Sequence, residues 1–196
     1  MRTLLTLILV GCLAAPEIAA QWSLGPELVT LRYAGTARDT GSLNAQPSGG
    51  LMTAFRVSRY WARWGAGLRI SYSRPGLAVG KQGVNIIDKT TGSLLEVSAA
   101  ASTRVGGIGP SGAVRLEVGP ALHLWDFDGE YRKRIGAVAA AAYEWPVSAR
   151  FTGSVRLEGM LSSSWFDAMD VPPEFERHAT WRYGVGLGLR YRLSGG

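Results

Sequence analysis

Charged residues recur at every second position in several short segments of this 196-residue chain. Arg115 and Glu117 are spaced in this way, and so are Arg156 and Glu158. Side chains two positions apart point to the same face of an extended strand, so each pair would share a face. The full set of candidate residues on such positions is Arg56, Arg69, Glu96, Arg115, Glu117, Glu144, Arg156, Glu158 and Arg190.

Ion pairing is the first chemistry that these residues could perform. An isolated charge in a narrow, poorly hydrated space costs several kcal/mol, so opposite charges there must pair. Arginine suits this role because its planar fork matches a carboxylate. We expect a structural plug of ion pairs. A polar path or gate for small solutes and a specific binding or catalytic site are the open alternatives.

The two histidines, His123 and His178, are the other candidates for catalysis. Nucleophilic catalysis needs a base and a nucleophile within hydrogen-bond reach. Side chains two positions apart share a face of a strand, but neither histidine is followed two positions later by a serine. His123 lies on the same face as the charged residues Glu117 and Arg115. We therefore assign no catalytic residue. With two histidines and one cysteine, we also expect no metal site and no cofactor.

Acidic residues are dotted through two of the connecting segments, at 126–130 and 167–176. They could bind Ca²⁺ or cations that bridge lipopolysaccharide. Their spacing does not match an EF-hand loop. We therefore interpret them as solvated loop charge.

Eight segments with a period of two carry these candidates. Such alternation predicts β-strands, because successive side chains point to opposite faces. Glycine is frequent, at 26 residues, which suits strands with a crowded inner face. The predicted strands are 22–33, 51–60, 64–73, 94–104, 113–125, 135–145, 150–161 and 181–193.

The last segment shows the two faces most clearly, with the sequence WRYGVGLGLRYRL. One set of alternate residues is apolar and aromatic, and the other contains only glycine and arginine. An apolar face with aromatic ends opposite a small or polar face is typical of a lipid-facing strand. The sequence therefore predicts an all-β fold, an eight-stranded antiparallel up-and-down transmembrane β-barrel.

A soluble lipocalin-like barrel is the alternative fold, with a polar exterior and an apolar interior. Lysine usage argues against it. The chain has only Lys81, Lys89 and Lys133, all in predicted connections. A soluble barrel would place charged residues on its outer strand faces.

Two strands contain an irregularity. In the first, the apolar positions change phase near Leu28, which predicts a β-bulge that turns Val29, Leu31 and Tyr33 outward. In the fifth, Pro120 cannot donate a ladder hydrogen bond, so we expect a bulge or local distortion there.

Glycines on the inner face of the last strand predict free space. Gly184, Gly186 and Gly188 would face the first strand, which contains Glu27. Any water-filled path through the barrel is expected along this seam.

The first 20 residues resemble a secretory signal peptide, with Arg2, a short apolar stretch and a cleavage site after Ala20. A lipobox with lipidation at Cys12 is the alternative. The predicted organisation is therefore a signal peptide at 1–20 and one barrel domain at 21–196. Cleavage after Ala20 would leave the mature chain without cysteine.

The predicted connections alternate in length. Long extracellular loops and short periplasmic turns distinguish the two ends of outer-membrane barrels. Aromatic residues, among them Tyr33, Tyr60, Trp64 and Trp125, cluster near both strand ends, as expected for rings at headgroup depth. The connections are 34–50, 61–63, 74–93, 105–112, 126–134, 146–149 and 162–179.

These features together resemble the small outer-membrane β-barrel superfamily, the OmpA-, OmpX- and OmpW-like porin-family barrels. The motif that carries the resemblance is the closing Tyr191-Arg192-Leu193, although family members commonly end that strand on an aromatic residue. The resemblance implies a location in the cell outer membrane. It also implies contact with lipid and lipopolysaccharide, and assembly by the barrel-assembly machinery.

The resemblance implies a structural, adhesion or surface-interaction role, or a minor small-solute pore, for a monomer. A lipid A-modifying enzyme and a soluble periplasmic lipid-binding barrel are the alternatives. The formal net charge of +6 could attract nucleic acid. We expect no such partner, because the arginines follow strand parity instead of forming one patch.

Overall fold

A computed structural model describes residues 21–34, 37–38, 44–81, 84–88, 92–109, 111–127, 129–164, 167 and 176–193. The predicted signal peptide at 1–20 and Cys12 lie outside these ranges. The described elements are all strands, and none of the described residues forms a helix long and apolar enough to cross a membrane.

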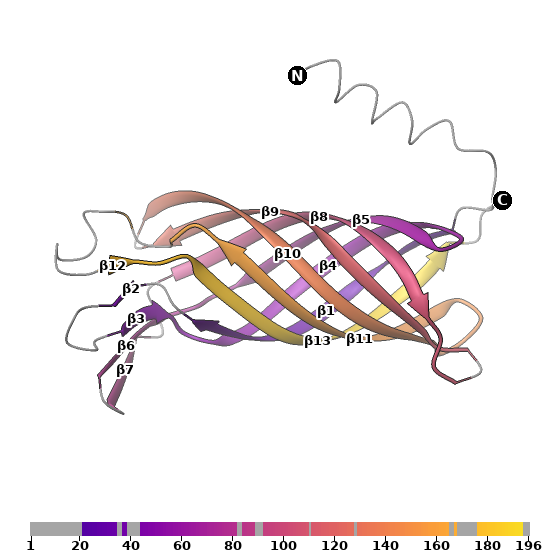
Figure 1. Cartoon of the computed structure of the whole chain (residues 1–196), viewed down its shortest axis with the longest axis horizontal. Helices are drawn as coiled ribbons and strands as arrows, with labels where there is room; N and C mark the ends of the chain where they lie inside the picture. The colour runs from indigo at the N-terminus through magenta and orange to yellow at the C-terminus, as the bar shows by residue number, and fades with distance from the viewer. Residues whose placement is uncertain are drawn as a thin grey trace, which may run out of the picture.

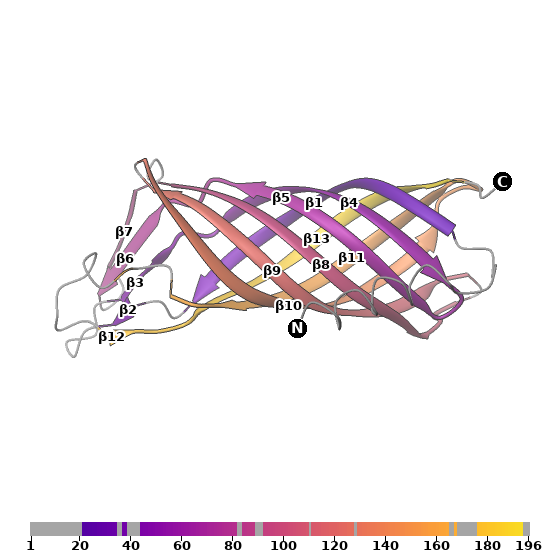
Figure 2. The ribbon, with the colours of Figure 1, turned by 90° about the horizontal axis from the view of Figure 1, so that it is seen from above.

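Eight antiparallel strands form a closed barrel (Figures 1 and 2). Each strand pairs with its neighbours in chain order, and the first strand closes the ring against the last. The predicted fold class is confirmed. The strands are β1 (Gln21–Ala34), β4 (Gly50–Trp61), β5 (Trp64–Ser73), β8 (Gly92–Gly106), β9 (Ala113–Phe127), β10 (Glu130–Pro146), β11 (Phe151–Ser162) and β13 (Thr180–Leu193).

The two ends of the barrel differ. We call one the turn end, because it holds Gln21, Leu193 and the connections β4–β5, β8–β9 and β10–β11. The β4–β5 turn has two residues, and Ala62 adopts a positive φ of 47° there, as tight hairpin turns require. The opposite end, which we call the loop end, holds the connections from β1, β5 and β11 (Figure 1).

The barrel exterior is apolar along its length. On β5, Leu68 is 60% exposed, whereas its neighbour Arg69 is 3% exposed. On β13, Leu187 is 63% exposed, whereas Arg190 is 3% exposed. This polarity is the reverse of a soluble barrel's, so the lipocalin-like alternative is wrong.

The bulge predicted near Leu28 is absent, because β1 pairs with β4 in one continuous register from Gln21 to Leu31. Leu28 faces outward and is 46% exposed, while Val29, Leu31 and Tyr33 face inward and are buried. The change of phase in the sequence marks apolar residues inside the barrel instead of a shift in the strand.

Two Gly-Pro pairs interrupt the ladders without shifting them. Around Pro120, β8 and β9 pair at Ser98 and Ala121, skip two residues, and resume in the same register. Around Pro26, β1 and β13 behave in the same way. The bulge considered at Pro120 is therefore absent, and the distortion is local. The one register shift between β8 and β9 lies at the turn end, near Arg104.

A second sheet of five short strands lies at the loop end (Figure 1). The spatial order is β12, β2, β3, β6 and β7, so three separate connections contribute to one sheet. This loop-end sheet was not predicted. Its strands are β2 (Ala37–Arg38), β3 (Asn44–Pro47), β6 (Leu77–Lys81), β7 (Val84–Asp88) and β12 (Glu176–Arg177).

The long loop predicted at 126–134 is also wrong. Strands β9 and β10 extend through most of it, and Phe127 pairs with Glu130. Gly129 in the connecting turn has a positive φ of 86°. Its N–H donates to the Asp126 carboxylate at 3.2 Å.

Candidate functional site

The barrel interior contains three layers of side chains, which follow one another from the loop end to the turn end. An apolar layer comes first, then a layer of buried ions, then a polar pocket that opens at the turn end. Inward positions on each strand pass through these layers in order. On β9, for example, they run from Trp125 through His123 and Glu117 to Arg115.

The middle layer consists of four arginines and four glutamates, which we call the central ion cluster. All eight side chains are at most 7% exposed. Seven of the eight barrel strands contribute, and only β10 does not. The members are Glu27, Arg56, Arg69, Glu96, Glu117, Arg156, Glu158 and Arg182.

The half of the cluster nearer the turn end is organised by Arg56 and Arg156. Arg56 contacts Glu27 at 2.8 Å and Glu117 at 2.7 Å, so it joins two carboxylates from opposite parts of the ring. Arg156 pairs with Glu117 and also with Glu158, at 3.1 Å. Shared partners of this kind hold each guanidinium in one position.

The half nearer the loop end is organised by Arg182 and Arg69. Arg182 contacts Glu96 at 2.6 Å and Glu158 at 3.3 Å. Arg69 contacts Glu27 at 2.9 Å and Glu158 at 3.2 Å, which links the two halves.

Charge balance explains how so many ions can be buried. Four guanidinium groups face four carboxylates, so the eight members together carry no net formal charge. Each charge also has a partner, which offsets its desolvation cost. A paired and neutral cluster that spans the barrel closes the lumen at this depth.

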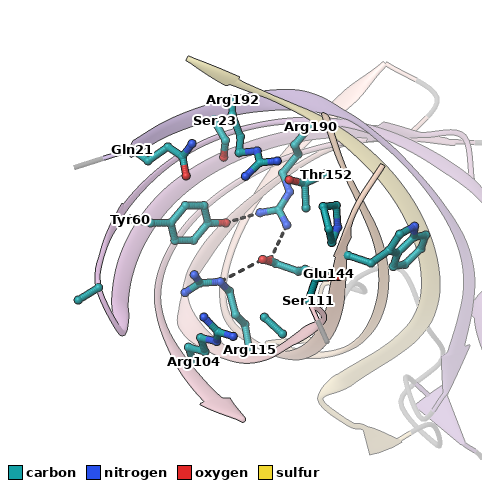
Figure 3. Close-up of a pocket in the computed structure, with 14 residues that line it drawn as sticks. Gln21, Ser23, Tyr60, Arg104, Ser111, Arg115, Glu144, Thr152, Arg190 and Arg192 are labelled. Carbon is teal, nitrogen blue, oxygen red and sulfur yellow. Dashed lines mark hydrogen bonds and ion pairs between the residues drawn. The ribbon is translucent and has the colours of Figure 1, made fainter. Parts of the chain in front are cut away.

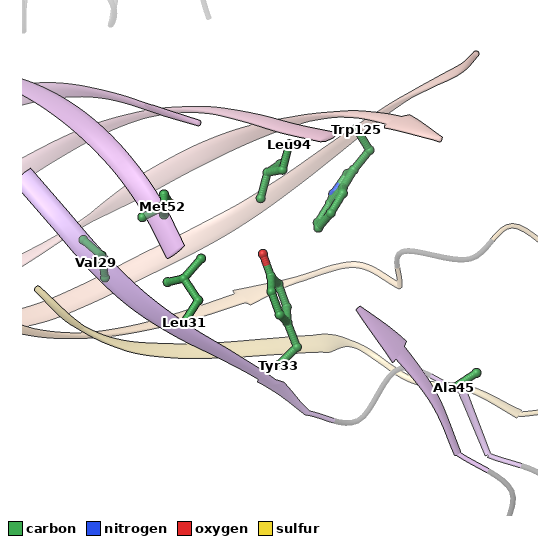
Figure 4. Close-up of a cluster of buried hydrophobic side chains, with 7 residues drawn as sticks. All are labelled: Val29, Leu31, Tyr33, Ala45, Met52, Leu94 and Trp125. Atoms are coloured by element: carbon green, nitrogen blue, oxygen red, sulfur yellow. The ribbon is translucent and has the colours of Figure 1, made fainter. Parts of the chain in front are cut away.

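The apolar layer, which we call the apolar cap, lies between the ions and the loop end. Figure 4 shows its side chains. Tyr33 and Trp125 face each other with ring centroids 6.2 Å apart. Both rings were expected near headgroup depth, but they point into the barrel and are buried. The cap consists of Val29, Leu31, Tyr33, Ala45, Met52, Leu94 and Trp125.

The polar pocket at the turn end has a volume of about 450 Å³ (Figure 3). Arg115 contacts Glu144 at 3.1 Å, and Arg190 pairs with the other oxygen of the same carboxylate. Arg190 also donates to the Tyr60 hydroxyl, and the Arg115 guanidinium lies 4.1 Å from the Tyr60 ring centroid. Tyr60, which was expected near headgroup depth, therefore points into the lumen.

The nine predicted site residues divide between two of these layers. Arg56, Arg69, Glu96, Glu117, Arg156 and Glu158 lie in the central ion cluster, and Arg115, Glu144 and Arg190 lie in the pocket. All nine are buried and paired. Two central members, Glu27 and Arg182, are missing from the predicted set. Strand parity alone could have identified Arg182, whereas the expected bulge obscured Glu27.

The seam predicted along the glycines of β13 is not open. A methyl group added at Gly184 or Gly186 would lie 2.9 Å from the Val29 side chain. At Gly188 it would lie 2.7 Å from the Ser154 hydroxyl. These glycines therefore provide room for inward side chains of neighbouring strands. The space beside them is filled, so it does not form a water path along this seam.

Neither histidine lies on the outer face of a barrel strand. His123 is fully buried in the lumen, with Nε2 3.2 Å from Glu96. His178 lies between β12 and β13, outside the barrel strands, and its Nε2 is 3.8 Å from Glu176.

Within the described ranges, no group of three His, Cys, Asp or Glu side chains could hold a metal ion. Two of the loop-end acids pair with arginines instead. Glu130 contacts Arg132 at 2.6 Å, and Asp167 contacts Arg134 at 2.6 Å.

Comparison with known proteins bears on the fold. No protein-family description and no curated protein sequence matches this chain. Among solved structures, the Neisserial surface protein A superposes with a TM-score of 0.51 at 9% identity, over 88% of this chain and 97% of that one. A major outer membrane protein from Thermus thermophilus gives 0.54 at 13% identity, over 89% and 100%. The chain has the fold of the small outer-membrane β-barrels.

The usual orientation of this fold in the outer membrane indicates which side each end of the barrel would face. The apolar exterior belongs in a bilayer, and the outer membrane is the bilayer in which this fold occurs. Short turns lie on the periplasmic side of such barrels and long loops on the extracellular side. In this usual orientation the turn-end pocket would lie on the periplasmic side and the loop-end sheet on the extracellular side.

Proposed function

We propose that this protein is a non-conducting outer-membrane barrel that contacts other molecules through its loop-end sheet. The observation that carries the proposal is the way this sheet is built. Connections from three separate parts of the chain come together in one ordered sheet. Ordering a backbone costs roughly 1–2 kcal/mol per residue, so loops that serve only as connections have no reason to fold together.

The apolar cap supports the proposal because it joins this sheet to the barrel. Ala45 of β3 is buried within the cap, and Leu77 and Val79 of β6 pack against it. A backbone hydrogen bond of 2.6 Å from Ser48 to Gly76 links the same two connections. Strands β3 and β6 are thus anchored to the barrel, which favours recognition because an anchored segment loses less entropy on binding.

The filled lumen argues against the pore alternative. A solute would have to displace both the apolar cap and the central ion cluster. Separating the buried ion pairs would leave unpaired charges, at a cost of several kcal/mol each. We therefore expect the barrel to act as a rigid support for the sheet.

Planar bilayer recording tests the non-conducting part. Folded wild-type protein, verified by heat-modifiable migration on a gel, should give no conductance steps. Discrete steps from such a sample would favour the pore and overturn this part of the proposal.

Replacement of the β6–β7 hairpin tests the surface role. Residues 77–88 would be exchanged for a short Gly-Ser linker, and cells displaying this variant would be compared with the wild type for autoaggregation and adherence. A matched control carries the same linker in place of residues 107–109 at the turn end. We expect loss of adherence only for the loop-end variant. Equal adherence of all three proteins would instead favour a structural role.

A further inference from the structure

The turn-end pocket carries an unusual excess of positive charge. Its lining contains four arginines and a single acid, Glu144. Glu144 already pairs with both Arg115 and Arg190, so it cannot neutralise the other two arginines. The pocket therefore has a net formal charge of +3, in contrast to the neutral cluster above it.

The pocket also contains buried donors that lack acceptors. Arg115 is 8% exposed, and its Nη1 has no hydrogen-bond partner among the described residues. The Nε atoms of Arg190 and Arg192 are in the same state. The guanidinium groups that carry these atoms are therefore not fully satisfied by acceptors of the protein.

Three of the four lining arginines, Arg115, Arg190 and Arg192, are held in place before any ligand arrives. Tyr60 fixes Arg190 through its hydroxyl and lies against Arg115 through its ring. The Arg192 Nη2 donates to the Ser148 carbonyl at 2.9 Å, which anchors that side chain at the rim. Figure 3 shows these guanidinium groups around the pocket. Preorganised forks of this kind match the oxygens of phosphate and carboxylate groups.

The surroundings would draw anions toward the pocket. Arg59, Arg63 and Arg150 lie at the same end of the barrel, outside the lining. Among the described residues, Glu144 is the only acid at this end. A surface of one sign raises the local concentration of oppositely charged solutes.

The volume of the pocket and its other lining groups limit the class of ligand that would fit. A volume of about 450 Å³ lies in the range of small-molecule sites, roughly 300–1,000 Å³, and exceeds what one inorganic anion fills. Hydroxyl groups of Ser23, Ser111 and Thr152 and the Gln21 amide also line it. These groups suit a polyhydroxylated molecule.

We propose that the turn-end pocket is a periplasmic binding site for a phosphate ester of about monosaccharide size. The guanidinium groups of Arg104, Arg115 and Arg192 bind the phosphate, and the hydroxyl and amide groups bind the sugar-like part. Such an ester could be a soluble sugar phosphate or the phosphoglycerol headgroup of an inner-leaflet lipid. This site is independent of the surface role proposed above.

Isothermal titration calorimetry with glucose 6-phosphate tests the site, using the full mature chain folded in a nonionic detergent. Glucose provides the uncharged control. We expect saturable binding of glucose 6-phosphate and none of glucose. Absence of binding, or equal binding of both, would overturn the proposal.

Three variants locate the site. Arg104→Gln and Arg192→Gln should each weaken binding by roughly 10- to 100-fold, because each removes one charge-assisted hydrogen bond to the phosphate. Glu144→Gln should tighten binding on the order of tenfold, because it removes the competing carboxylate. Arg63→Gln is the matched control, an arginine at the same end but outside the lining, and should change affinity less than about twofold.

If the pocket binds an anion, Glu144→Gln should raise the affinity for glucose 6-phosphate. If Glu144 only forms a structural ion pair, the same change should not raise that affinity. Heat-modifiable migration would first show that each variant is folded. If Glu144→Gln fails to fold, the two rim arginine variants still decide. Unchanged affinity in both Arg104→Gln and Arg192→Gln would contradict the proposal.

A second titration, in lipid nanodiscs, distinguishes the two sources of the ester. The titration would be repeated in nanodiscs of phosphatidylcholine alone and in nanodiscs that also contain phosphatidylglycerol. Loss of glucose 6-phosphate binding only with phosphatidylglycerol would support the site and assign it to a lipid headgroup. Equal binding in both would support the site and assign it to a soluble ester.

Discussion

Arg182 of β13 and Glu96 of β8 meet across the lumen at 2.6 Å, and neither side chain is exposed. Arg182→Met would leave the Glu96 carboxylate without its shortest contact in a buried site. Loss of one partner from a buried pair typically costs about 3–5 kcal/mol. We expect the free energy of unfolding to fall by that amount, measured by urea titration of vesicle-inserted protein with tryptophan fluorescence.

The double variant Arg182→Met/Glu96→Gln should recover part of this loss, because it removes both charges. Arg150→Met, at an exposed site of the turn end, controls for loss of an arginine and should change stability by less than about 1 kcal/mol. A loss in the double variant equal to the sum of the two single losses would show that the charges do not interact.

Gly25 and Gly119 lie against the backbone of the neighbouring strand. A methyl group at Gly25 would overlap the Leu189 carbonyl oxygen, and one at Gly119 would overlap that of Ala99. Alanine at either position would push the strands apart, at a cost of roughly 1–3 kcal/mol. Urea titration should show this loss for both variants.

Gly159→Ala is the matched control for these variants. Gly159 also lies in a barrel strand, but an added methyl group there meets no atom within 4 Å. Its stability should stay within about 0.5 kcal/mol of the wild type. If all three variants lost the same free energy of unfolding, the loss would come from placing alanine in a strand and not from the close approach of the neighbouring backbone.

Trp125→Ala removes the largest side chain of the apolar cap. We expect the free energy of unfolding to fall by about 3–5 kcal/mol, as for other buried aromatic truncations. Conductance in planar bilayers should remain absent, because the central ion cluster still closes the lumen. Channel steps in this variant would show instead that the cap is the main barrier.

Arg134→Gln tests the ion pair with Asp167 at the loop end. Asp167 is about half exposed, with 54% of its side chain accessible, so water already screens this contact. Exposed pairs contribute roughly 0–1 kcal/mol. Urea titration should therefore show a loss below about 1 kcal/mol, far smaller than that of Arg182→Met.

The sequence predicted the barrel strands well wherever inner and outer faces differ in polarity. On β5 and β13 the inner positions are glycine, serine and arginine, so alternation reveals both the strand and its orientation. On β1 the pattern failed beyond Leu28. Val29, Leu31 and Tyr33 belong to the apolar cap, and an apolar inner face cannot be distinguished locally from an apolar outer one.

The loop-end sheet could not be predicted from the sequence for a different reason. Strands β2 and β12 have two residues each, too few to show any periodicity. Their pairing depends on the barrel, which brings the ends of β1 and β11 to the same place. The turn-end pocket was also unpredicted, because parity identified Arg115, Glu144 and Arg190 as inward residues but gave no indication of unfilled space beside them.

The pairing of β1 with β13 constrains when the molecule can fold. Ala34 pairs with Trp181, so the last ladder joins segments from opposite ends of the chain. Loop-closure entropy and high contact order make such a ladder slow to form. The ring cannot close until β13 is available, so one edge of β1 must remain unpaired until then. The barrel is therefore most exposed to aggregation, and most dependent on assistance, just before its final strand arrives.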